Sequence, residues 1–365
     1  MSLSEGYNFV DRALHHVAFS TSIVHSALDQ LECDLYSRQL EAVTTKDEVF
    51  VTGLPRAGTT LILELLYGTG EFATYTYRHM PFIRAPLIWD RVTRRFQRVA
   101  KEGERAHGDG MKISFDSPEA FEEVVWLHHL RERIVKDDYL SPLCAEEGTA
   151  EFAEAMRAAI CKLLLLESAP NGSPLRYLSK NNANVSRVDL IASLFPSCMI
   201  VVPFRKPLAH VSSLMTQHRQ FTLRHHEDAF ARRYMKWLGH HDFGEHFKPI
   251  NFDGWLDANE TGTHDEIDFW LAYWLATYTY IYRYVTDRAG DRVMLIDYDM
   301  LLEKRGAVLE AIAERLRLRE PETLISSAGQ LRSPTTLPIE SDACSSAMLE
   351  AAESLHRRLT GLALH

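Results

Sequence analysis

The chain has 365 residues, which is enough for one large α/β domain or two ordinary domains with a sizeable core. Its formal net charge of −10, with 46% hydrophobic and 25% charged residues, is typical of a soluble protein. This charge excludes a general nucleic-acid binder, because no net basic field attracts a polyanion, so an anion site has to be local.

The five cysteines are far apart and form no C-x-x-C pair. This pattern favours reduced thiols over a disulfide framework or a zinc site. The first residues do not form a basic segment followed by an apolar one, as a signal peptide would, and no apolar run is long enough for a membrane span. We therefore expect a cytoplasmic protein.

Apolar periodicity predicts an N-terminal helical extension over 1–45, made of two short amphipathic helices, and a main domain over 46–365. In the main domain, strands are predicted at 49–52, 111–115, 176–180, 198–204 and 293–296. Helices are predicted at 61–67, 92–103, 121–130, 149–167, 188–194, 208–217, 268–285, 307–316 and 346–359. The alternation predicts an α/β fold, in which a central parallel sheet of about five strands has helices on both faces.

Residues 218–265 interrupt this alternation and are rich in histidine, aromatic residues and glycine, which predicts an irregular or helical insertion over the site. The histidines form no H-E-x-x-H pattern and include two adjacent pairs, so a metal site is not expected there. Aromatic residues repeat along the helix predicted at 268–285. We interpret this series as core, with only its end lining an acceptor pocket.

The stretch Val49 to Thr60, VFVTGLPRAGTT, combines a buried strand, a tight loop and a helix N-terminus. Free backbone N–H groups and the helix dipole favour an anion at such a junction. Gly53 and Gly58 have the spacing of the Walker A loop, but Thr59 replaces its lysine and Arg56 lies inside the loop. The loop is therefore predicted to hold phosphate in a P-loop NTPase-like, three-layer fold, without the lysine that an ATPase uses.

A second basic segment follows the strand predicted at 198–204. Arg205 lies at the end of this strand, and Ser213 follows eight residues later in the next helix. A guanidinium and a hydroxyl at this spacing can bind one anion.

Together, these two segments resemble the sulfotransferases that use 3′-phosphoadenylyl sulfate (PAPS). GLPRAGTT resembles the 5′-phosphosulfate loop of that family, in the P-R-[SA]-G-T-T form of its tyrosylprotein and bacterial members. RKPLAHVSSLM resembles the 3′-phosphate segment, and Arg205 and Ser213 match its spacing. Two further stretches, LSKNNANVSR at 178–187 and IDYDML at 296–301, are similar to other segments of the family. The similarity covers about residues 48–215 and 290–318.

The resemblance implies PAPS as co-substrate, no metal, and transfer to a hydroxyl or amine of a small-molecule, lipid or glycan acceptor. Segment 218–265 would form an acceptor-side cap, and an oligomer is possible. Arg56 would stabilise the leaving phosphate by charge. The residues implied to bind the donor are Pro55, Arg56, Ala57, Gly58, Thr59, Thr60, Arg205 and Ser213.

The residue that takes the acceptor's proton is left open by the sequence. Family members use a histidine or a glutamate downstream of the loop. His107 is about where cytosolic members place their histidine, and His79 is near the glutamate of the tyrosylprotein enzymes. Asp109 either orients the ring of His107 or acts as the base itself, and Glu119 or Glu123 are further candidates.

Two other functions remain open. A P-loop kinase or NTPase would use ATP with Mg²⁺, and the missing lysine argues against it. A non-catalytic nucleotide-binding interaction module would not need Arg56, whose presence argues against that class.

Overall fold

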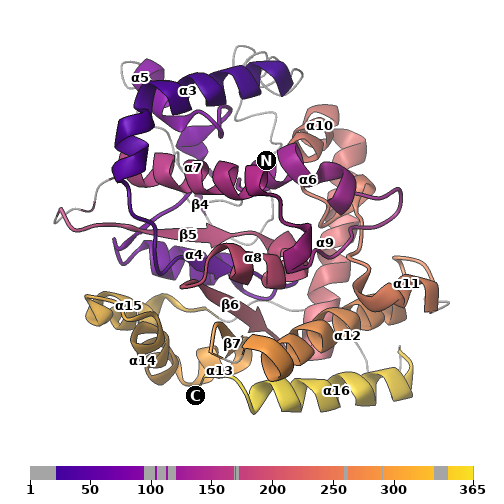
Figure 1. Cartoon of the computed structure of the whole chain (residues 1–365). Helices are drawn as coiled ribbons and strands as arrows, with labels where there is room; N and C mark the ends of the chain where they lie inside the picture. Colours follow the sequence, from indigo (N-terminus) through magenta and orange to yellow (C-terminus); the bar gives the residue numbers. More distant parts are fainter. Residues whose placement is uncertain are drawn as a thin grey trace.

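The computed structural model describes residues 22–93, 103–104, 112–113, 121–167, 169, 172–258, 262–289, 291–332 and 344–364. Five strands form one parallel sheet in the order β2-β5-β1-β6-β7 (Figure 1). The strands are β1 (Val49–Val51), β2 (Phe72–Ala73), β5 (Arg176–Lys180), β6 (Met199–Phe204) and β7 (Val293–Asp297). The predicted fold class, a parallel sheet with helices on both faces, is confirmed.

The two faces of the sheet pack into two separate cores. In β1, Val49 and Val51 belong to one cluster of buried side chains, while Phe50 between them belongs to the other. Successive side chains of a strand point to opposite faces, so an unbroken apolar run supplies both cores at once. This explains why the strands read as continuous hydrophobic stretches.

Helices cover both faces. The core that contains Val49 and Val51 is completed by α4 (Thr59–Tyr67), α14 (Arg305–Leu316) and α15 (Pro321–Ser326), next to α13 (Tyr298–Glu303). The core that contains Phe50 is completed by α6 (Glu123–Ile134), α7 (Ala150–Leu166), α8 (Val188–Leu194), α9 (Pro207–Glu227), α12 (Ile267–Tyr284) and α16 (Ser346–Thr360). The result is a three-layer arrangement.

The N-terminal part that the structure describes is one 21-residue helix, α3 (Ser22–Ala42), and the rest of the predicted helical extension lies outside the described residues. It packs on α5 (Pro86–Thr93) and α7 at the top of Figure 1. Buried Lys162 of α7 lies 2.6 Å from Asp29 and 3.3 Å from Glu32 of this helix. Such buried pairs fix where a helix docks, because separating them would leave a charge without its partner.

Several elements differ from the prediction. Helix α9 continues to Glu227, so the 218–265 insertion begins as an extension of this helix and goes on with α10 (Ala229–Trp237) and α11 (Trp255–Ala258). The two-residue edge strand β2 was not predicted. The strand predicted at 111–115 is β4 (Lys112–Ile113), which pairs with β3 (Gly103–Glu104) outside the main sheet. Short helical turns occupy Tyr77–His79 (η1), Ala145–Glu147 (η2), Asn182–Ser186 (η3), Gly244–His246 (η4), Phe252–Gly254 (η5), Val285–Ala289 (η6) and Ser327–Gln330 (η7).

All five cysteines are free thiols. Among the described residues, no helix is both long and apolar enough to cross a membrane.

The carboxyl ends of the strands meet at one edge of the sheet. The last residue of β1, Val51, is in register with Lys180 of β5 and Val201 of β6, and Phe204 of β6 is in register with Asp297 of β7. Ligands of open α/β sheets bind at this edge, near the point where the strand order reverses. The loop at 52–58 and Arg205 both follow strands that end there.

Candidate active site

The loop between β1 and α4 turns sharply and leads directly into a helix. Gly53, Arg56 and Gly58 have φ angles of 144°, 68° and 102°. A Cβ atom on Gly58 would lie 2.5 Å from the ring of Tyr298, so only glycine fits there. Helix α4 begins at Thr59, which leaves the first N–H groups of the helix beside the loop. This is the geometry of a phosphate-binding loop.

Two buried contacts hold the loop from the protein side. The Thr52 hydroxyl donates to the Asn181 carbonyl at 2.8 Å, and His210 Nε2 donates to the Pro55 carbonyl at 2.8 Å. Burial lowers the pKa of His210 to about 3, and the charge of Arg205 acts in the same direction. The ring is therefore neutral at physiological pH, with its proton on Nε2. His210 is a positioning residue of the loop that the sequence did not single out.

The second predicted segment meets the loop in space. Arg205 follows β6, Pro207 opens α9, and Ser213 lies in that helix. Arg205 donates to the Arg56 carbonyl at 3.1 Å, and Arg56 Nε donates to the Ser213 hydroxyl at 3.2 Å. The structure thus brings together three side chains that the sequence assigned to one anionic ligand.

Arg205 is a buried cation that forms no ion pair with any described carboxylate, although the charge of Asp299 acts on it from beyond ion-pair distance. Its side chain is 5% exposed and lies over the Tyr298 ring at 5.3 Å. Within the described ranges, its Nε has no hydrogen-bond partner and no carboxylate forms an ion pair with it. Burial lowers the pKa of this guanidinium, which means that its charged form is poorly solvated. A charge left in this state is costly, and an anionic ligand would offset the cost.

A chain of hydrogen bonds runs from the loop to the 218–265 insertion. The Thr59 hydroxyl donates to Asn182 Oδ1 at 3.0 Å, and Asn182 Nδ2 donates to Asp242 Oδ2 at 2.9 Å. Neither Asn182 nor Asp242 was predicted to have a role. Asn182 is the second residue after the end of β5, which is a usable signal. Asp242 carries no local signal, because its neighbours come from distant parts of the chain.

A small cavity of about 10 Å³ adjoins this chain of contacts. Its lining includes Pro55 of the loop, Leu214 of α9 and Asp242, with Trp270 and Tyr273 of α12. The two aromatic residues come from the beginning of the series on α12. The expectation that only the end of this series faces a pocket is therefore wrong for this cavity.

The candidate bases from the sequence fall in different places. His107, Asp109 and Glu119 lie outside the described residues. His79 is 2% exposed in η1, where its Nδ1 accepts from the Thr76 N–H at 2.9 Å and its Nε2 lies 3.8 Å from Glu167.

Glu123 is held by a buried arginine. Both of its carboxylate oxygens accept from Arg187 at 2.7 Å, and one of them also accepts from Asn181 at 2.6 Å. This arrangement suits a structural carboxylate that fixes the turn after β5, rather than a base.

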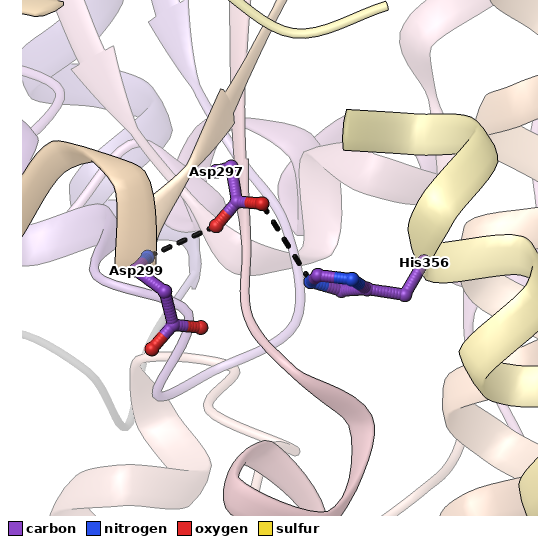
Figure 2. Close-up of side chains that lie close together, drawn as sticks. All are labelled: Asp297, Asp299 and His356. Atoms are coloured by element: carbon purple, nitrogen blue, oxygen red, sulfur yellow. Dashed lines mark hydrogen bonds and ion pairs between the residues drawn. The ribbon is translucent and has the colours of Figure 1, made fainter. Parts of the chain in front are cut away.

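One further cluster of polar side chains lies at the end of β7, opposite His356 of α16 (Figure 2). Asp297, Asp299 and His356 are close enough to share a cation, but Asp297 is already occupied. Its Oδ1 accepts from the N–H groups of Asp299 and Met300 at 3.0 and 3.3 Å, and its Oδ2 accepts from the Thr360 hydroxyl at 2.8 Å. We therefore interpret Asp297 as the N-cap of α13 and a tie to α16.

Comparison with known proteins identifies the class. The model of the sulfotransferase family matches residues 48–252, a range that contains the loop, Arg205, Ser213 and Asp242. This range is more than half of the chain, and the chain belongs to the sulfotransferase family. The resemblance predicted from the two motifs is confirmed.

Solved structures give a consistent picture of the fold. Sulfotransferase STF9 from Mycobacterium avium has a TM-score of 0.53 at 14% identity, over 90% of this chain and 80% of that one. Sulfotransferase STF1 from Mycobacterium tuberculosis H37Rv has a TM-score of 0.47 at 15% identity, over 92% of this chain and 81% of that one. Only the first score supports a shared fold. No curated protein sequence matches the chain significantly.

Proposed function

We propose that the protein transfers a sulfuryl group from PAPS to a hydroxyl group, or less readily an amine, of a small acceptor molecule. The observation that carries this proposal is the buried Arg205, which has no ion-pair partner among the described residues, beside Arg56 and Ser213. A nucleotide with phosphates at both the 5′ and 3′ positions fits a loop at a helix N-terminus and a second, separate cation.

The loop would hold the 5′-phosphosulfate through its N–H groups, including that of Thr59, and through the Thr60 hydroxyl. Arg56 would neutralise the charge that develops on the leaving phosphate oxygen. Arg205 and Ser213 would bind the 3′-phosphate. The transferred group carries a single negative charge, so we propose that no metal takes part.

The acceptor would bind under segment 218–265, which we propose acts as its cap. Asp242, Lys248 and Ile250 of this segment line the cavity next to Pro55. Five free thiols suit a reducing compartment, and we propose the cytoplasm.

Isothermal titration calorimetry tests the donor. We expect binding of adenosine 3′,5′-bisphosphate without Mg²⁺, and no comparable binding of ATP with Mg²⁺. Tight binding of ATP–Mg²⁺ alone would reject the proposal in favour of a kinase. Nucleotide binding without transfer to any acceptor would instead indicate an interaction module.

A further inference from the structure

Asp242 is linked to the loop through Asn182. Its Oδ2 accepts from the Asn182 amide, and the Asn182 side-chain oxygen accepts from Thr59. Because a carboxylate only accepts hydrogen bonds, the Asn182 N–H₂ has to face Asp242 and its oxygen has to face the Thr59 hydroxyl. The described residues provide no hydrogen-bond partner for Asp242 Oδ1, which leaves one carboxylate oxygen for a further contact.

Two hydrogen bonds within residues 241–248 hold the backbone around Asp242. His241 Nδ1 donates to the His246 carbonyl at 2.9 Å, and the Lys248 N–H donates to the His241 carbonyl at 3.0 Å. The next residue, Phe243, is buried in the core at 5% exposure. A catalytic group requires such a rigid setting, because proton transfer depends on its position within fractions of an ångström.

The cavity next to Asp242 has the volume of about one water-sized group, which suits a hydroxyl and not a whole acceptor. Its walls are mainly apolar, with Leu214 and Trp270 fully buried and Ile250 at 4% exposure. A charged acceptor would lose solvation against these walls, and an anion would also be repelled by Asp242. The cavity therefore favours a neutral hydroxyl on an apolar scaffold.

Two other titratable side chains line the cavity, and neither is placed to act as a base. Lys248 Nζ donates to the carbonyls of Lys136 and Asp137, the first at 2.7 Å. Burial raises the pKa of Tyr273, so its phenol stays neutral at working pH. Among the groups that line this cavity, Asp242 is the carboxylate that can accept a proton.

We propose that Asp242 is the general base of the transfer, and that the acceptor is an alcohol or phenol on an apolar scaffold. The inference rests on the proposed sulfotransferase function. Asp242 removes the proton of the acceptor O–H while the acceptor oxygen bonds to sulfur. The S–O bond to the 5′-phosphate breaks, and its electron pair leaves with the phosphate oxygen next to Arg56. The products are a sulfate ester, adenosine 3′,5′-bisphosphate and a protonated Asp242, which returns its proton to water.

The test measures transfer of ³⁵S from labelled PAPS to 2-naphthol, with N-acetylglucosamine as a polar comparison, at one fixed pH. The variant is Asp242→Asn, which keeps an oxygen for the Asn182 amide but cannot take a proton. Its matched control is Glu245→Gln, three residues away in the same segment, where the carboxylate pairs with Arg232 at the surface. The Kd for the bisphosphate, measured by calorimetry, shows whether each variant is correctly folded.

We expect Asp242→Asn to lower kcat by about 10²- to 10⁴-fold, the range for general-base catalysis. The KM for 2-naphthol and the Kd for the bisphosphate should stay within about threefold, because asparagine fills the same space as aspartate. A purely structural Asp242 would be rescued by asparagine. The control should match the wild type.

The inference is overturned if Asp242→Asn keeps more than about one-tenth of the wild-type kcat. It is also overturned if the wild type binds the bisphosphate but sulfates only N-acetylglucosamine, or neither probe. A wild-type protein that does not bind the bisphosphate refutes the proposed function itself, which is a distinct result.

Discussion

Arg205 offers the sharpest test of the donor site, because it is a buried charge whose partner would be the ligand. Its side chain is 5% exposed, and one N–H is used on the Arg56 carbonyl. Truncating one partner of a buried, hydrogen-bonded charge pair costs about 2–4 kcal/mol, which is about 30- to 1,000-fold in Kd. We expect this loss for adenosine 3′,5′-bisphosphate in Arg205→Ala. Arg205→Lys should recover part of it, since lysine keeps the charge but not the planar fork.

The 3′-phosphate assignment requires a second ligand. Adenosine 5′-phosphate lacks the group that Arg205 would bind, so Arg205→Ala should change its Kd by less than about threefold. The ligand-free variant should unfold with a free energy no more than about 1 kcal/mol below that of the wild type, because a poorly solvated charge has been removed. Calorimetry and chemical denaturation measure these quantities, with exposed Arg283→Ala as control. Equal weakening of both nucleotides, or none, would refute the reasoning.

Three other predictions concern the scaffold of the site. His210, with its pKa held near 3 by burial, contributes stability that is complete above pH 6.5 and is lost as the pH falls towards 3. Denaturation of His210→Gln should therefore show a shallower acid dependence, by up to about 1.4 kcal/mol per pH unit; an identical slope would contradict the assignment. Glu123→Gln should destabilise the fold by about 3–5 kcal/mol, because Arg187 is fully buried against it, and a loss below 1 kcal/mol would argue against this pair. Gly58→Ala should abolish bisphosphate binding through its clash with Tyr298, and calorimetry that finds normal affinity would show that the loop adapts.

Much of the donor side could be predicted from local sequence. A buried strand alternates its side chains between two cores, so β1, β6 and β7 appear as apolar runs bounded by turn residues. The loop is recognisable because its glycines occupy positive-φ positions, where other residues are strained. Strand β2 was missed because two residues, Phe72 and Ala73, carry no periodicity.

The acceptor side could not be predicted in the same way. Asn182 and Asp242 are 60 residues apart in sequence, and Asp242 is one of many polar residues in a segment without a repeating pattern. Glu123 looked like a candidate base until the structure showed both oxygens held by Arg187.

The sequence by itself determined the parallel sheet, from the alternation of strands and helices, and the strand–loop–helix unit at 49–67, because both follow from local patterns of residues. Only the tertiary structure decided that Arg205 is buried without an ion-pair partner among the described residues, and that Asp242 is linked to the loop through Asn182. Burial and encounters between distant segments depend on how the elements pack against one another, and local sequence does not encode that packing.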